Sequence, residues 1–94
     1  MAKIRRVVLD VLKPHEPKMV PFTEKLSDNE DVSGVTSKLV EIEEDVRTIR
    51  VTLEGEDIDM DAIEGRITDL GGSVHSVDEV SVGKEIVEDP WIPN

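Results

Sequence analysis

The sequence predicts an α+β domain in which a four-stranded antiparallel sheet carries two helices on one face. Two observations lead to this fold. Segments rich in β-branched residues with alternating polarity, typical of strands, are interrupted twice by segments with the helical spacing of apolar residues. The chain has 94 residues, which is enough for only one hydrophobic core, so all segments must share it.

The N-terminal half is expected to supply a strand and a helix. Residues 4–12 alternate, and Val7, Leu9 and Val11 make the odd-numbered face the more apolar one. Pro14 and Pro17 end this strand. Residues 17–27 have helical spacing of apolar residues, although Pro21 is expected to break or kink the first turn.

The remaining segments continue the pattern. A polar loop (28–34) precedes a weakly alternating second strand (35–43), and Glu44-Asp45 is a plausible hairpin turn. The third strand (46–54) directs Ile49, Val51 and Leu53 to one face. A second helix follows, capped by Asp57 or Asp59 and stopped at Gly71-Gly72, and residues 74–82 form the fourth strand.

Right-handed crossovers place the first and third strands in the centre, so the predicted strand order is 4-1-3-2 and the fold is ferredoxin-like, βαββαβ. The domain is expected to span residues 1–87, and residues 88–94, with Trp91 and Ile92 between Pro90 and Pro93, to form a tail or oligomerisation arm. The sheet face away from the helices stays open. Its mixed surface is typical of a subunit contact and consists of Arg6, Val8, Asp10, Leu12, Arg50, Thr52, Glu54, Val77 and Glu79.

Three stretches carry a family resemblance. They are Leu9-Asp10-Val11-Leu12-Lys13-Pro14-His15-Glu16-Pro17, Glu54-Gly55-Glu56-Asp57-Ile58-Asp59 and Gly71-Gly72-Ser73-Val74-His75-Ser76-Val77-Asp78-Glu79-Val80. From about Ile4 to Val87 the chain resembles the archaeal family called domain of unknown function 211. The resemblance implies a ferredoxin-like fold, an archaeal cytoplasm and homo-oligomers, with rings as the expected form, and it implies no known activity. Pro21 and the ending from Asp89 to Asn94 depart from the family pattern.

The amino-acid composition limits the classes of partner that the protein is expected to bind. Twenty-two acids against eleven bases give a net charge of −11, which repels nucleic acids and anionic lipid, so neither nucleic acid nor membrane is expected as a partner. The N-terminal segment lacks the features of a signal peptide or a spanning helix, and a cytoplasmic location is expected. Cysteine is absent, so disulfides cannot support the modest core, and self-association is the expected source of further buried surface.

One candidate metal site gathers where the first strand ends. His15 and Glu16 follow that strand, the hairpin brings further acids, and Asp10 is expected beside His75 on the open face. Imidazole and carboxylate ligands suit zinc-like divalent ions. The alternative is structural: His15 is a loop residue, and His75 is hydrogen-bonded to Asp10.

A second candidate site lies at the other end of the sheet, where the acids are led by Asp57 and Asp59. An all-oxygen set suits calcium or magnesium. The spacing fails the EF-hand pattern, because Ala62 and Thr68 occupy the positions of its glycine and glutamate, and helix capping explains the same acids.

No catalytic motif is present, so an enzyme is not expected. The leading interpretation is an oligomeric module that binds divalent cations through its acidic clusters. The alternatives are a regulatory module that binds an unidentified small metabolite between subunits, by analogy with amino-acid-sensing domains, and, less favoured, a metal-dependent hydrolase using His15, Glu16 and His75.

Overall fold

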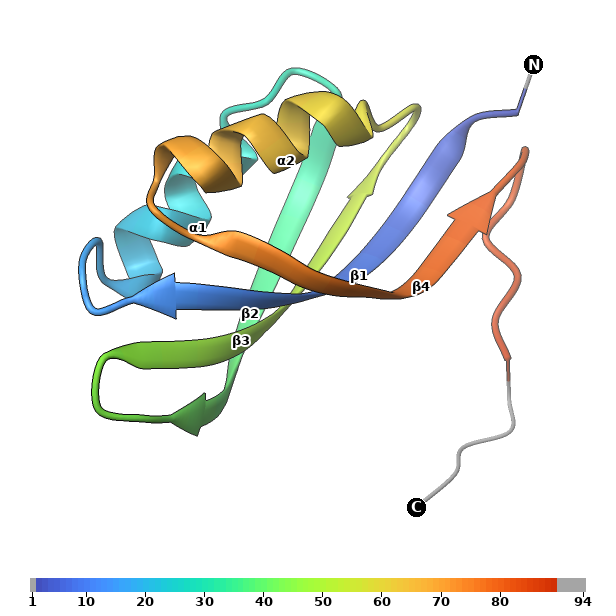
Figure 1. Cartoon of the computed structure of the whole chain (residues 1–94). Helices are drawn as coiled ribbons and strands as arrows, with labels where there is room; N and C mark the ends of the chain where they lie inside the picture. Colours follow the sequence, from blue (N-terminus) through green and yellow to red (C-terminus); the bar gives the residue numbers. More distant parts are fainter. Residues whose placement is uncertain (1, 90–94) are drawn as a thin grey trace.

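The computed structural model describes residues 2–89, and these form the predicted ferredoxin-like fold. The six elements, in chain order, are β1 (Ile4–Pro14), α1 (Met19–Ser27), β2 (Val32–Ile42), β3 (Val46–Gly55), α2 (Met60–Asp69) and β4 (Ser73–Val82). All strand pairs are antiparallel, and the order across the sheet is β2-β3-β1-β4, the same as the predicted 4-1-3-2. Figure 1 shows both helices on one side of the strands.

The core lies between the central strands and the helices. Val7, Leu9 and Val11 of β1 stand opposite Leu53, Val51 and Ile49 of β3, and all six are fully buried. Phe22 and Leu26 cover them from α1, and Ile63 and Ile67 from α2. The predicted inner faces of both central strands are therefore confirmed.

Element ends follow local chemistry. Asp59 is the residue that caps α2, because its side chain accepts the N–H of Ala62 at 3.2 Å. Gly71 follows the helix with φ +88°, a left-handed conformation that glycine adopts without strain. Helix α1 runs through Pro21, since a proline in the first turn removes an N–H that has no intrahelical partner there.

The edge strand β4 differs from the expected regular alternation. Its pairing with β1 shifts register between Val8 and Leu9 and again between Asp10 and Val11. Each shift is typical of a β-bulge, which places one extra residue in one strand. Val77 consequently stands opposite the buried Leu9, on the helix side of the sheet, and the prediction that it lies on the open face was wrong.

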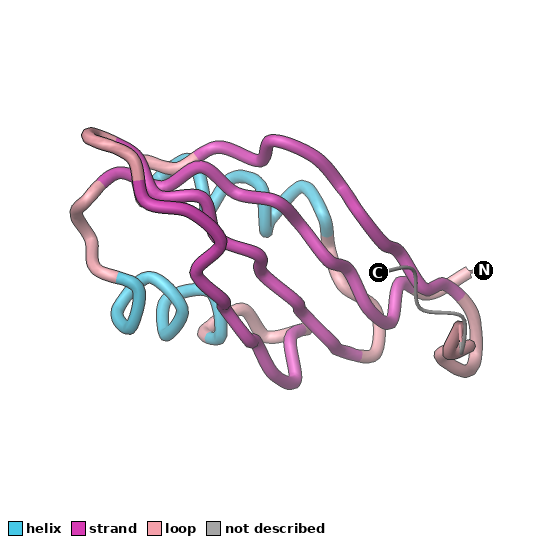
Figure 2. Tube along the Cα trace, turned by 90° about the horizontal axis from the view of Figure 1, so that it is seen from below, coloured by secondary structure: helices cyan, strands magenta, loops and turns pink. Residues whose placement is uncertain are grey.

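The segment after β4 returns to the start of β1. The N–H of Gly83 donates to the carbonyl oxygen of Lys3 at 2.8 Å, so the two segments meet at one end of the sheet (Figure 1 and Figure 2). The tail prediction for residues 88–94 falls mostly outside the described residues, because Trp91, Ile92 and both flanking prolines lie beyond residue 89. No helix within residues 2–89 is long and apolar enough to cross a membrane.

Candidate functional site

The end of β1 meets the β2–β3 hairpin, as the topology predicts. The ring Nε2 of His15 lies 2.8 Å from the carbonyl oxygen of Glu44, and because a carbonyl only accepts, the imidazole donates this hydrogen bond. Glu16 is exposed and stands 3.8 Å from the ammonium of Lys18. His15 and Glu16 therefore lie together at this end of the sheet.

Asp10 and His75 are not opposite each other. The register places Ser76 across from Asp10, and His75 lies at the shift between the Asp10 and Val11 pairings, exposed on the edge strand. A bulge displaces the side chains that a regular alternation would align. The sequence could not show this, because nothing in it marks the position of the extra residue.

The aspartate side chains at the opposite end of the sheet accept hydrogen bonds from backbone N–H groups. Besides capping α2, Asp59 donates its own N–H to Asp31 Oδ2, and Asp57 Oδ1 accepts the N–H of Ile4 at 3.4 Å. These contacts correspond to the capping alternative. Within residues 2–89 no group of three or more His, Asp or Glu side chains is placed to hold a metal ion, and the cation sites of both ends stay predictions.

A hollow of about 300 Å³ lies between the end of β1, the start of α1 and the hairpin, and we call it the β1-end pocket. Basic side chains dominate its lining: Lys13, His15, Lys18 and Arg47. Glu16 is its one acid, and Met19 and Leu39 supply an apolar wall. In a chain of net charge −11 this is a local reversal of sign.

Lys13 is the buried member of this set, with 1% of its surface exposed. Its ammonium donates to the carbonyl oxygens of Pro14, at 2.8 Å, and Pro17, and lies 5.9 Å from the centre of the Phe22 ring. Burial, followed by the nearby charge of Arg47, lowers the pKa of Lys13. Because both hydrogen-bond partners are neutral carbonyl oxygens, neither of them offsets the cost of burying the Lys13 charge as a carboxylate would.

Arg47 stands directly opposite Lys13 in the β1–β3 register. Its Nη1 is buried and has no hydrogen-bond partner among the residues that the structure describes. Two cations at facing positions of a sheet repel each other, and an unpaired buried donor is rare in native proteins. The pocket thus holds unsatisfied positive charge.

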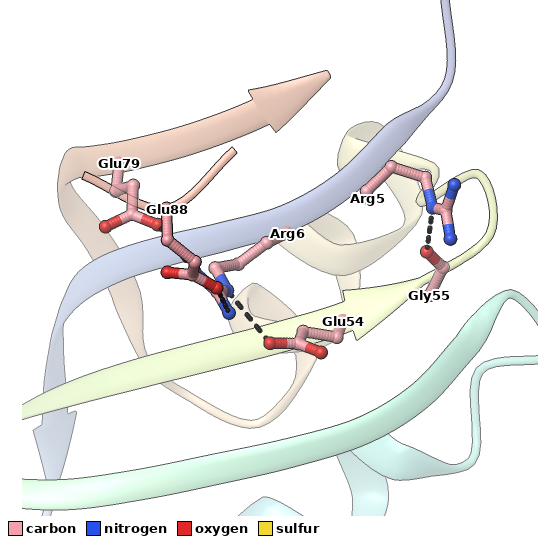
Figure 3. Close-up of polar contacts among 6 residues, drawn as sticks. All are labelled: Arg5, Arg6, Glu54, Gly55, Glu79 and Glu88. Carbon is pink, nitrogen blue, oxygen red and sulfur yellow. Dashed lines mark hydrogen bonds and ion pairs between the residues drawn. The ribbon is translucent and has the colours of Figure 1, made fainter. Parts of the chain in front are cut away.

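A second polar cluster lies on the open face around Arg6, whose side chain is 19% exposed (Figure 3). Its guanidinium contacts Glu54 at 2.8 Å, Glu79 at 3.3 Å and Glu88 through both oxygens, at 3.1 and 2.9 Å. The hydrogen bond from Arg6, then its charge, lowers the pKa of Glu88, and these contacts raise the pKa of Arg6. Together with Arg5, which donates to the carbonyl oxygens of Gly55 and Lys84, this cluster holds the segment after β4 against the sheet.

Lys13 and Arg47 were absent from the predicted site residues. The signal that could have found them is their position in the alternation. Lys13 continues the buried series Val7, Leu9, Val11, and Arg47 precedes the buried series Ile49, Val51, Leu53. A basic residue in a core-facing position indicates a special environment, because lysine and arginine are almost never fully buried without a partner.

Comparisons with known proteins agree with the family resemblance. The model of the family described as "Uncharacterized ArCR", domain of unknown function 211, matches residues 5–94. An uncharacterized protein of Methanocaldococcus jannaschii is 44% identical over 93 residues, covering 99% of this chain and 96% of that protein. The chain therefore belongs to the domain of unknown function 211 family.

Proposed function

We propose that the protein is a non-enzymatic module that assembles head to tail with copies of itself. The observation that carries this proposal is a pair of apolar patches on opposite edges of one sheet. A head-to-tail contact joins two different patches and closes into a ring when the rotation between neighbours permits. Copies of one chain can therefore cover both patches at once.

The first patch, called the β4 patch, consists of Val77, Val80 and Val82, which are 52%, 53% and 48% exposed. Val77 and Val80 stand opposite the buried Leu9 and Val7 of β1, so they extend the core-facing surface beyond the area that the helices cover, and Val82 continues the strand opposite Ile4. A row of half-exposed valines on an edge strand is typical of a surface that another molecule covers.

The second patch, called the β2 patch, consists of Leu39, Val40 and Ile42, which are 47%, 53% and 58% exposed. It lies at the hairpin end of the other edge strand, where the hairpin extends past the helices (Figure 1). Both edge strands carry register shifts, which interrupt a regular row of backbone donors and acceptors. Side-chain packing, rather than continuous strand pairing, is therefore the mode of contact that we propose.

Charges next to the two patches support a second copy as the partner. Lys38, opposite Arg50, adds positive charge to the open face near the β2 edge, while Glu79, opposite Val8, adds negative charge to the same face at the β4 edge. A contact between two β4 edges brings two copies of Glu79 together, whereas a head-to-tail contact places Glu79 towards the edge that carries Lys38. The head-to-tail arrangement is thus favoured.

Size-exclusion chromatography with light scattering tests the proposal. The wild type is expected to elute as an oligomer, and Val77→Lys/Val80→Lys as a smaller species, because burying two lysines in an apolar contact is costly. Val87→Lys is the matched control, since Val87 is 84% exposed and belongs to neither patch. A monomeric wild type at all concentrations, or an unchanged mass in the double variant, would refute the proposal.

The alternative predicted from the sequence is a small metabolite bound between subunits, and the feature that supports ligand binding is the β1-end pocket. It is formed by residues of a single chain, so binding there does not depend on assembly.

A further inference from the structure

The β1-end pocket combines positive charge, burial and an unpaired donor in one place. Lys13 is fully buried and donates only to neutral carbonyl oxygens, and Arg47 faces it across β1 and β3 with a buried nitrogen lacking a partner within residues 2–89. Glu16, the one acid of the lining, is exposed and stands beside Lys18. No carboxylate of the described residues therefore pairs with Arg47 inside the pocket.

The start of α1 adds to the same field. Lys18 and Met19 line the pocket at the N-terminus of this nine-residue helix, which has no side-chain cap and no acid in its first turn. The free N–H groups of a helix N-terminus carry partial positive charge and favour an anion. Lys13, Arg47 and the N-terminus of α1 thus all favour an anion in the pocket.

The rest of the lining limits what the anion is. Met19 and Leu39 form an apolar wall, and about 300 Å³ is more space than an inorganic ion needs. A guanidinium matches the planar geometry of a carboxylate and can bind it through two N–H groups. A charged head against Arg47 and a short apolar chain against Met19 and Leu39 would satisfy both parts of the wall.

From these observations we infer that the β1-end pocket binds a small organic carboxylate, with Arg47 and Lys13 holding the carboxylate and Met19 with Leu39 contacting its apolar chain. The inference goes beyond the proposed assembly and does not rest on it.

Titration calorimetry and thermal unfolding with sodium 3-methylbutanoate, sodium acetate and sodium phosphate test the inference, with sodium chloride at equal ionic strength as reference. The branched carboxylate is expected to bind most tightly and to raise the melting temperature above that in chloride. Arg47→Met is expected to weaken its binding at least about tenfold, because a hydrogen-bonded charge pair is lost.

Arg50→Met is the matched control, because Arg50 lies on the same strand but is exposed and opposite Asp10 on the open face. This variant is expected to bind as the wild type does, and circular dichroism verifies that both variants fold. Tighter binding of phosphate than of either carboxylate would show the pocket to be a phosphate site and overturn the assignment of ligand class. Equal melting temperatures in 3-methylbutanoate and chloride, or equal losses in the two variants, would overturn the site itself.

Discussion

Replacing Arg47 by methionine should stabilise the protein when no binding anion is present. Methionine keeps much of the aliphatic stem but removes the guanidinium, with its buried unpaired Nη1 and its repulsion of Lys13. If the Arg47 guanidinium instead stabilised the folded state, its removal would destabilise the protein. The sign of the change therefore tests whether the positive charge in the β1-end pocket is unsatisfied.

The magnitude follows from two terms. An unsatisfied buried donor costs about 1–3 kcal/mol, and a like-charged pair at facing positions costs roughly 0.2–1 kcal/mol. Partial solvation of the guanidinium and lost stem packing reduce the gain, so we expect about 1 kcal/mol. In a domain of this size that corresponds to a melting temperature about 4–8 °C higher.

Because of Lys13, the free energy of unfolding should also depend on pH. The pKa of Lys13 is lowered on folding, by burial and by Arg47, against an opposing contribution from Glu16, and Lys18 adds a further lowering. The unfolded chain therefore binds the proton more tightly, and wild-type stability should rise with pH from the lowered pKa of folded Lys13 towards its ordinary value of 10.5. Arg47→Met should reduce this alkaline gain, because the charge next to Lys13 is gone.

Urea unfolding in sodium chloride, followed by circular dichroism across this pH range, measures both effects. Arg50→Met serves as the control and should stay within about 0.5 kcal/mol of the wild type, as surface substitutions usually do. A lower free energy of unfolding for Arg47→Met than for the wild type in chloride would refute the reasoning, because it would mean that the Arg47 charge is already satisfied.

Three further predictions concern contacts at the other end of the sheet from the β1-end pocket and on helix α2. Asp59→Ala should cost about 1 kcal/mol in urea unfolding by removing the cap of α2, and Asp59→Asn should restore most of it, since asparagine also caps; equal losses would contradict the capping role. Because the pKa of Glu88 is lower in the folded protein, the stability that its contact with Arg6 contributes is present above the pKa of the unfolded chain and is lost as the pH falls through the pKa of the folded protein. Arg6→Met should weaken this loss of stability in acid and should speed hydrogen exchange in residues 84–89. Unchanged hydrogen exchange would exclude the anchoring role of Arg6. A Cβ on Gly55 would lie 2.0 Å from the backbone oxygen of Asp31, so Gly55→Ala should destabilise the protein by about 1–3 kcal/mol. Gly65 lies on α2 with open space around it, so Gly65→Ala should stabilise the protein slightly. Similar melting temperatures for the two variants would be inconsistent with this packing.

The sequence was sufficient for the fold because the central strands and the helices follow simple periodicities. Val7, Leu9 and Val11 alternate regularly, and right-handed crossovers then leave one strand order. Predicted ends were less accurate: β2 begins at Val32 instead of Val35, since the turn residues before it did not show where pairing starts. Edge strands are the least regular part, because only one side of each is paired.

The candidate site was predicted only in part. Topology correctly brought His15 to the hairpin, but the bulges of β4 separated Asp10 from His75 in register. The basic pair was missed because Lys13 and Arg47 lie on different strands, and only the β1–β3 register sets them opposite each other. A basic residue in a core-facing series of apolar residues indicates a buried charge, but whether that charge is paired depends on the residue that faces it on the neighbouring strand.

A mixing experiment tests the proposed assembly most directly. Val77→Lys/Val80→Lys retains the β2 patch, and Val40→Lys/Ile42→Lys retains the β4 patch, so each variant alone should be monomeric. If copies associate head to tail, an equimolar mixture should form a mixed dimer, with one copy of each variant, in native mass spectrometry, because one complementary pair of patches survives. Monomers only in the mixture, or a dimer of the Val40→Lys/Ile42→Lys variant by itself, would contradict the head-to-tail account.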